Sequence, residues 1–149
     1  MTDSKPIVIG ADDAGLGLKG IIKGYLDDLG VSYDDVGVDT PDATALGIDY
    51  PDVAETAATG IRDGRYDRGI LICGTGIGIS MAANRHRHVR AALVHDVTSA
   101  RLTRQHNNAN VLCLGARLTG ADVAKDCLKV FLTTDFEGGR HENRVAKLG

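Results

Sequence analysis

The chain has 149 residues, of which 43% are hydrophobic and 25% are charged, and its formal net charge is −3. This length fits a single domain over residues 1–149, and the charge gives no reason to expect nucleic acid or an anionic membrane as a partner. No apolar run is long enough to span a membrane, the first residues lack the apolar core of a signal peptide, and three cysteines at unrelated spacings indicate neither a disulfide framework nor a zinc site, so we expect a reduced cytoplasmic protein.

The first third of the chain alternates between apolar runs and helical patterns. Residues 6–10 are predicted as a short buried strand, and residues 16–29 as a helix, because apolar side chains recur there at helical spacing. Gly30 is expected to end that helix. Residues 31–36 follow as a second strand, and residues 37–49, with a proline and several aspartates, as a loop.

Strands and helices also alternate in the rest of the chain. In chain order they are the helix 51–63 with proline at its start, the strand 68–73, the helix 76–85, the strand 90–94, the helix 97–104, the strand 109–114 and the helix 120–132. Residues 133–149 are predicted to form a polar, basic tail.

This alternation, with most strands apolar throughout, indicates an α/β fold whose parallel sheet is covered by helices on both faces. Right-handed crossovers then place ligands at the carboxyl ends of the strands. Asp12, Cys73, His95 and residues 110–115 are expected on or beside those ends.

The most informative motif follows the strand 68–73, where Cys73 precedes three alternate glycines, Gly74, Gly76 and Gly78. Backbone N–H groups that glycine leaves unblocked suit a phosphate, a carboxylate or an oxyanion formed during a reaction. The alternative is that Cys73 is a small core residue at the end of a strand. For Cys113, inside an apolar strand, and for Cys127, on a helix, core packing is the prediction.

Three better-known glycine or cysteine loops are excluded. The dinucleotide fingerprint needs glycine at the sixth position, which is Ile79 when counted from Gly74. The phosphate loop of nucleotide hydrolases needs a Gly-Lys-Ser/Thr ending, which is absent from the chain. A low-molecular-weight phosphatase needs arginine six positions after its cysteine, where this chain again has Ile79.

The order of motifs along nearly the whole chain resembles type B ribose-5-phosphate isomerases, in a family that includes the galactose-6-phosphate isomerase subunits. The matching segments are residues 10–15, 49–52, 69–80, 104–112 and 136–144. The resemblance implies a Rossmann-like three-layer α/β/α sandwich with a five-stranded sheet, and an aldose–ketose isomerase that uses neither metal nor cofactor. It also implies a sugar phosphate as substrate and a homodimer, sometimes paired into a tetramer, with active sites shared between subunits.

By this resemblance, Cys73 is the base that moves a proton through an enediolate, and Thr75 is a hydroxyl partner near the sugar. Backbone amides of the loop from Gly74 to Gly78, Ile77 among them, would hold the enediolate oxygens. A thiol is mostly protonated at neutral pH, so such a site must stabilise the thiolate. The alternative for Thr75 is a turn residue whose hydroxyl bonds its own backbone.

His106, followed by Asn107, resembles the family's ring-opening histidine, and a residue that titrates near neutrality suits that proton transfer. The alternative is a surface histidine after a helix. His86, His88 and His95 match no catalytic position in the family. For the first two, which lie among arginines, a solvated basic turn is predicted.

Arg140 and Arg144 are four residues apart, so on a helical turn both would face one side and could bind one phosphate. The alternative is a disordered basic tail. The resemblance favours phosphate binding, adds Arg117 after the fifth strand, and places His141 near the phosphate. The basic tail is thus expected to contribute to the site.

Asp12 and Tyr50 match family residues that contact the substrate, and Asp12 also suits a helix N-cap. The family usually has histidine at the next position, where this chain has Asp13. A carboxylate there would repel a phosphate at close range unless it pointed away or were protonated. Ribose-5-phosphate is the first predicted substrate, and a tetrulose phosphate or another sugar phosphate is the second.

Two other classes of function remain open at this point. A non-catalytic nucleotide or sugar-phosphate binding module is encouraged only by Asp13. A redox-responsive protein that uses Cys73 ranks last, because no resolving cysteine lies nearby in the sequence.

Overall fold

The computed structural model describes residues 4–149, and these residues fold around one five-stranded parallel sheet. Its strand order is β2-β1-β3-β5-β4. The strands are β1 (Ile7–Ala11), β2 (Tyr33–Asp35), β3 (Gly69–Cys73), β4 (Ala91–Leu93) and β5 (Val111–Gly115). Three of them, β1, β3 and β5, are buried along their whole length, as expected for strands covered on both faces.

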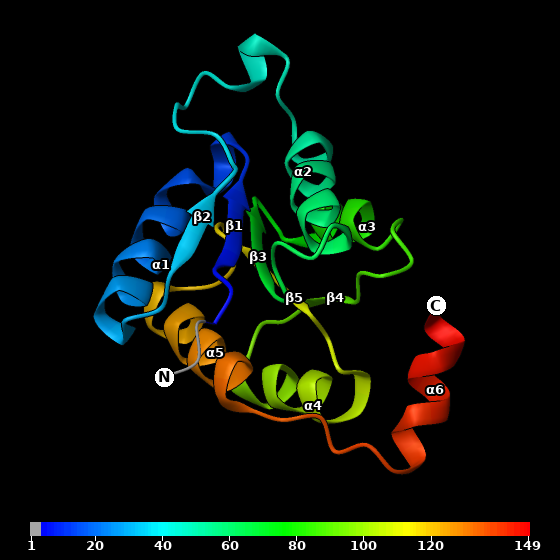
Figure 1. Cartoon of the computed structure of the whole chain (residues 1–149). Helices are drawn as coiled ribbons and strands as arrows, with labels where there is room; N and C mark the ends of the chain where they lie inside the picture. Colours follow the sequence, from blue (N-terminus) through cyan, green and yellow to red (C-terminus); the bar gives the residue numbers. More distant parts are fainter. Residues whose placement is uncertain (1–3) are drawn as a thin grey trace.

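Helices cover both faces of the sheet (Figure 1). They are α1 (Leu16–Leu29), α2 (Tyr50–Arg62), α3 (Ile77–Ala83), α4 (Val97–Asn107), α5 (Ala121–Thr133) and α6 (Arg140–Leu148), with short 3-10 turns η1 (Asp13–Gly15) and η2 (Thr44–Leu46). One core joins α1, α4 and α5 to the sheet, and a second core joins α2 and α3 to its other face. The predicted three-layer α/β/α sandwich is confirmed.

The side of the sheet to which the next strand is added reverses between β1 and β3. The connection after β1 runs to the neighbouring β2, whereas the connection after β3 crosses to the other side of the sheet. A crevice therefore opens at the carboxyl ends of β1 and β3, where Asp12 and Cys73 lie. The Asp12 amide donates to the Ile72 carbonyl at 3.3 Å and holds the two strand ends together.

Several elements differ from the sequence predictions. Helix α4 extends to Asn107, so His106 lies within its last turn rather than after it. The basic tail contains α6, a helix with half-buried Val145 and buried His141, so the disordered alternative is wrong. Asn110 lies before β5, at the amino edge of the sheet, and its side chain bonds Arg90 and His88 there. Among residues 4–149, no helix combines the length and the apolar character needed to cross a bilayer.

The two histidines predicted in a solvated turn are half-buried against α2. His86 Nε2 lies 2.7 Å from the Glu55 carboxylate, and His88 Nε2 lies 2.7 Å from the Ala58 carbonyl. The turn is correct, but its histidines pack onto a neighbouring helix, which a local sequence pattern does not reveal.

Gly115, the last residue of β5, lies directly against the backbone of Thr75 in the loop after β3. A Cβ at position 115 would lie 2.5 Å from the Thr75 carbonyl carbon, closer than real Cβ atoms approach. We expect Gly115→Ala to lower the free energy of unfolding by about 1–3 kcal/mol, the usual range for overpacking, because backbone cannot move aside as a side chain can.

The matched control is Gly20→Ala in α1, where an added Cβ would have no neighbour within 4 Å. It should raise the free energy of unfolding by up to about 1 kcal/mol, since alanine loses less backbone entropy in a helix. Urea unfolding curves measure both variants, and destabilisation of both to the same extent would contradict the steric explanation.

Candidate active site

The predicted base lies in a surface hollow at the carboxyl ends of β1 and β3, which we call the cysteine hollow. It is lined by Asp12, Asp13, Ala14, Tyr50, Cys73, Gly74, Thr75, Ile77, Gly78 and Arg117. All but three of the predicted active-site residues before residue 120 are therefore brought together; the exceptions are Gly76, within the loop itself, and the pair His106 and Asn107.

Cys73 is only 4% exposed, less than its place at a strand end suggests. Its Sγ accepts a hydrogen bond from the Gly76 amide at 3.1 Å. That bond requires the loop to fold back on itself, and Gly76 allows this with a φ of +78°, in the region that favours glycine. This bond fixes the position of the sulfur within the loop.

The loop amides are only partly available to a ligand. The Gly76 amide is used by Cys73, and the Ile77 amide donates to the Thr75 hydroxyl at 3.2 Å. The turn interaction considered for Thr75 is therefore present, although its hydroxyl hydrogen remains able to donate. The amides of Gly74, Thr75 and Gly78 are the loop's remaining candidate donors for an oxyanion.

Two neighbouring carboxylates form one side of the cysteine hollow. Asp12 caps η1, because its Oδ1 accepts from the Gly15 amide at 3.1 Å. Burial raises the pKa of Asp12 and outweighs the opposing effect of that hydrogen bond. Asp13 accepts from the Ala14 amide at 2.9 Å and from the Thr44 hydroxyl at 2.7 Å, so both of its oxygens are already bonded within the chain.

Tyr50 and Arg117 form the opposite walls. Tyr50 begins α2, and its ring packs so closely on α3 that a Cβ at Gly78 would lie 2.8 Å from Cε1 of the ring. The Arg117 side chain lies over Gly74, where an added Cβ would be 3.5 Å from its Nε. Gly78 thus lets the Tyr50 ring approach the backbone, whereas a Cβ at Gly74 would make only an ordinary contact with Arg117.

The remaining predicted residues line a second hollow between α4 and α6, the histidine hollow. It is formed by His106, Asn107, His141, Arg144, Val145 and Leu148. The rings of His106 and His141 stack, with centroids 4.4 Å apart and planes 14° apart. Burial lowers the pKa of His141, and the charges of His106 and Arg140 lower it further.

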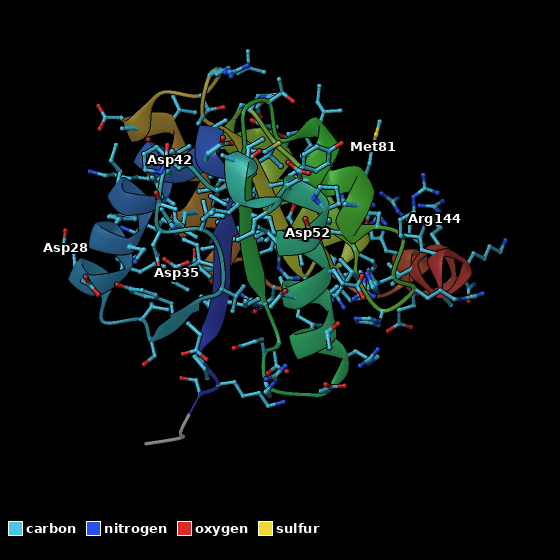
Figure 2. The ribbon with its side chains drawn as sticks, turned by 90° about the horizontal axis from the view of Figure 1, so that it is seen from above. Asp28, Asp35, Asp42, Asp52, Met81 and Arg144 are labelled. Atoms are coloured by element: carbon cyan, nitrogen blue, oxygen red, sulfur yellow. The ribbon has the colours of Figure 1, made fainter. Side chains whose placement is uncertain are left out.

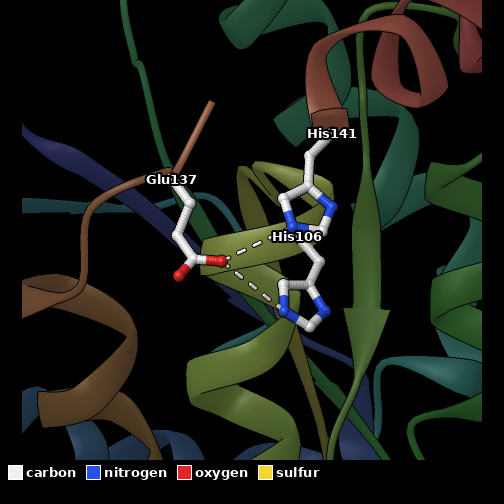
Figure 3. Close-up of side chains that lie close together, drawn as sticks. All are labelled: His106, Glu137 and His141. Atoms are coloured by element: carbon white, nitrogen blue, oxygen red, sulfur yellow. Dashed lines mark ion pairs between the residues drawn. The ribbon is translucent and has the colours of Figure 1, made fainter. Parts of the chain in front are cut away.

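Glu137, which the sequence prediction missed, lies beside the two histidines of this hollow. Its Oε1 lies 3.7 Å from His106 Nε2 and 3.4 Å from His141 Nε2 (Figure 3). The spacing Glu137–His141 is i, i+4, a signal that was visible in the sequence, but its meaning depended on His106 from a distant segment.

Arg140 and Arg144 are exposed on α6. Figure 2 shows Arg144 at one side of the molecule, across from Asp42 in the loop before α2. The buried Arg104 anchors this region: it donates to the carbonyls of Ala109 at 2.6 Å and Thr134 at 3.1 Å, which ties the end of α4 to the segment leading into α6.

The two hollows lie at opposite edges of the sheet. In the parallel pairing of β3 with β5, Cys73 is level with Gly115, the last residue of β5. His106 instead precedes Val111, the first residue of β5, and the four steps of about 3.3 Å from Val111 to Gly115 separate those strand ends by about 13 Å. His106 and Arg144 therefore lie away from the edge that carries Cys73, whereas Arg117 lies with Cys73.

The other two cysteines are core residues, as predicted. Cys113 lies in β5 and Cys127 in α5, both fully buried. Burial raises the pKa of the Cys113 thiol, and raises that of Cys127 to about 11, so both are poor nucleophiles.

The chain is similar in sequence to known proteins. A family model described as Ribose/Galactose Isomerase matches residues 7–148. The D-erythrulose-4-phosphate isomerase of Pectobacterium atrosepticum is 44% identical, over 96% of this chain and 92% of that protein. Ribose-5-phosphate isomerase B of Escherichia coli is 43% identical, over 95% of this chain and 92% of that protein.

The fold is also similar to those of solved structures. A ribose 5-phosphate isomerase from Thermotoga maritima superposes with a TM-score of 0.92 at 44% identity, covering 98% of each chain. These matches confirm the resemblance drawn from the motifs. They also confirm the predicted enzyme class, an aldose–ketose isomerase.

Proposed function

Because this chain belongs to the ribose/galactose isomerase family, we propose that it interconverts ribose-5-phosphate and ribulose-5-phosphate through an enediolate. The observation that carries the proposal is the Cys73 thiol, held by the Gly76 amide beside unoccupied loop amides and two carboxylates. A base next to oxyanion donors is what proton transfer beside a carbonyl needs.

In the proposed reaction, the Cys73 thiolate takes the proton from the carbon next to the carbonyl. The bonding electrons move to the carbonyl oxygen and form the enediolate, which the amides of Gly74, Thr75 and Gly78 stabilise. One such donor typically contributes about 3–4 kcal/mol to lowering the barrier. The proton of the neighbouring hydroxyl passes to the former carbonyl oxygen, the Cys73 thiol returns its proton to the former carbonyl carbon, and the electrons left on the deprotonated oxygen form the new carbonyl.

Asp12 and Tyr50 would bind sugar hydroxyls, with the Thr75 hydroxyl beside them. His106, supported by Asn107, would transfer the proton that opens the sugar ring. Arg140 and Arg144, one helical turn apart on α6, would bind the phosphate with His141. Arg117 would neutralise part of the charge near the enediolate, since it lies over Gly74.

The placement of these residues in two separate hollows leads us to include a second copy of the chain in the proposal. The two ends of β5, beside which the hollows lie, are about 13 Å apart, and this separates Cys73 from His106 within one chain. In a symmetric dimer, the histidine hollow of one protomer can complete the cysteine hollow of its partner. We therefore propose a homodimer with shared active sites, with pairing into a tetramer as a further possibility of the family.

A cytoplasmic location is part of the same proposal. Cys73, Cys113 and Cys127 are all free thiols in the described chain, as is usual in a reducing compartment. The partners proposed are a sugar phosphate and a second copy of the chain.

A tetrulose phosphate is the second candidate substrate, and Asp13 is the observation that favours it. Its carboxylate lines the cysteine hollow and holds Thr44 of the loop before α2 in place. A negative charge and a fixed loop both favour a shorter substrate whose phosphate stays away from this side. The similarity to the Pectobacterium atrosepticum D-erythrulose-4-phosphate isomerase supports the same alternative.

Replacing the proposed base tests the reaction. Cys73→Ala should lower kcat for ribose-5-phosphate by at least about a hundredfold, the low end for loss of a general base. Formation of the ketose in metal-free buffer measures it. Cys127→Ala removes a fully buried thiol from α5 and should keep normal turnover. Normal turnover by Cys73→Ala would contradict the assignment of Cys73 as the base.

Asp13→His tests what sets the substrate. The substitution removes a carboxylate from the cysteine hollow, so it should shift the ratio of kcat/KM for ribose-5-phosphate over D-erythrulose-4-phosphate by about tenfold toward the pentose, about what one unit charge at close range contributes. Asp28→His on the exposed side of α1 makes the same change far from the hollow. Identical ratios for wild type and Asp13→His would exclude Asp13 as the selector.

Mixed dimers test the shared site. One chain carries Cys73→Ala and the other carries His106→Asn with Arg140→Ala, each inactive alone. Unfolding and refolding them together in equal amounts should restore about a quarter of wild-type activity, because half of the dimers are mixed and each mixed dimer has one intact site of two. Activity that stays at the level of the separate variants would place the whole site within one chain.

A further inference from the structure

Three side chains with metal-binding atoms converge in the histidine hollow (Figure 3). His106 comes from the last turn of α4, His141 from the first turn of α6, and Glu137 from the segment between α5 and α6. Their candidate ligand atoms all lie within 4.8 Å of one another. The proposed reaction gives Glu137 no part, so its place between the two histidines needs another explanation.

The distances in this cluster suit a shared ion better than direct hydrogen bonds. Glu137 Oε1 is 3.7 Å from His106 Nε2 and 3.4 Å from His141 Nε2, beyond the usual range of N–H···O bonds. Ligands bound to zinc at 2.0–2.1 Å in a tetrahedron lie about 3.3 Å from one another. Both Nε2 atoms lie near the same carboxylate oxygen. Since the two rings stack with planes 14° apart, one imidazole must turn out of the stack before both nitrogen lone pairs point at a shared ion.

The donor set selects a class of ion. Two imidazole nitrogens and one carboxylate oxygen suit zinc, cobalt or nickel, whereas magnesium and calcium prefer oxygen ligands alone. Three protein ligands leave a fourth position open, as in zinc sites that keep a water molecule.

His141 and the main chain of Glu137 are fixed in place, whereas the Glu137 side chain can still move. The His141 side chain is 7% exposed, and the Glu137 amide donates to the Gln105 carbonyl at 3.1 Å, which fixes the segment against α4. The Glu137 carboxylate itself is half exposed and free to close on an ion. Arg140 and Arg144 on the same helix repel a cation, so the ion should bind reversibly.

We propose that His106, Glu137 and His141 form a reversible site for a divalent transition-metal ion, with zinc the best fit, and that this ion inhibits the enzyme. The inhibition rests on the proposed function, because zinc on His106 would occupy the nitrogen that opens the sugar ring. The ion would also hold His141 away from the phosphate.

Calorimetric titration with zinc tests the site itself. The full chain is used with Cys73→Ser, which removes a competing thiol, and one ion should bind per chain. Adding Glu137→Gln should weaken binding by at least about tenfold, since loss of even a residue that only orients a ligand costs that much. Glu137 is half exposed, so this variant should fold normally.

His86→Asn is the matched control, because His86 also contacts a glutamate, at 2.7 Å, but without a second imidazole nitrogen on the same carboxylate. It should leave zinc affinity unchanged. No binding, or equal affinity with and without Glu137→Gln, would overturn the site.

Activity measurements test the inhibition. With Cys73 intact, zinc should inhibit ribose-5-phosphate isomerisation, and Glu137→Gln should require at least about tenfold more zinc for half inhibition. Binding by calorimetry without inhibition would overturn the regulatory half of the proposal. A chain that is inactive in metal-free buffer would instead contradict the proposed function, while the calorimetric result would still decide the site.

Discussion

The parallel pairing of β3 with β5 is the constraint on which the rest of the structure depends. It sets Cys73 level with Gly115 at one edge of the sheet, and the crossover helix α4 must return to the other edge before β5 begins. His106, in the last turn of α4, is therefore held at the edge opposite to Cys73. No side-chain rotation can join them, so the topology divides the residues of the proposed reaction between two hollows.

The two halves are also opposite in charge. The cysteine hollow carries Asp12 and Asp13 against one guanidinium, whereas the histidine hollow has two imidazoles with Arg140 and Arg144 close by on α6. Under the proposed function, a sugar phosphate between two protomers would direct its hydroxyls to the carboxylates and its phosphate to the arginines. A substrate with one polar neutral end and one dianionic end matches this gradient, and it would bind in one orientation only.

Local sequence patterns predicted the helices and strands well. They did not show how the candidate site residues are divided between the two hollows. The bounds of α1 follow from apolar spacing and from Gly30, whose φ of +69° closes the helix, and both signals lie within one segment. The cysteine–glycine loop is local for the same reason. Glu137 was missed because its partner His106 is distant in sequence, and the opposite placement of His106 follows from sheet topology rather than from its neighbours. The low exposure of Cys73 reflects packing from the second core, which no motif describes.

The residues proposed for chemistry and those proposed for selectivity are held by different kinds of bond. The Cys73 loop is fixed by main-chain hydrogen bonds, from Ala116 to the Cys73 carbonyl and from Arg117 to the Gly74 carbonyl, which substitutions of side chains leave intact. The loop before α2 is instead held by side-chain bonds. The Thr44 hydroxyl donates to Asp13, and the buried Lys19 ammonium bonds the Val38 carbonyl and Asp35.

Burial raises the pKa of Asp35, but hydrogen bonds from Lys23 and Lys19 outweigh it and keep that pKa below its usual value, so this anchor stays ionised at neutral pH. A few side-chain changes can thus reshape the hollow without disturbing the base. Under the proposed function, this separation would let the length of the accepted sugar change while the proton transfer at Cys73 is kept.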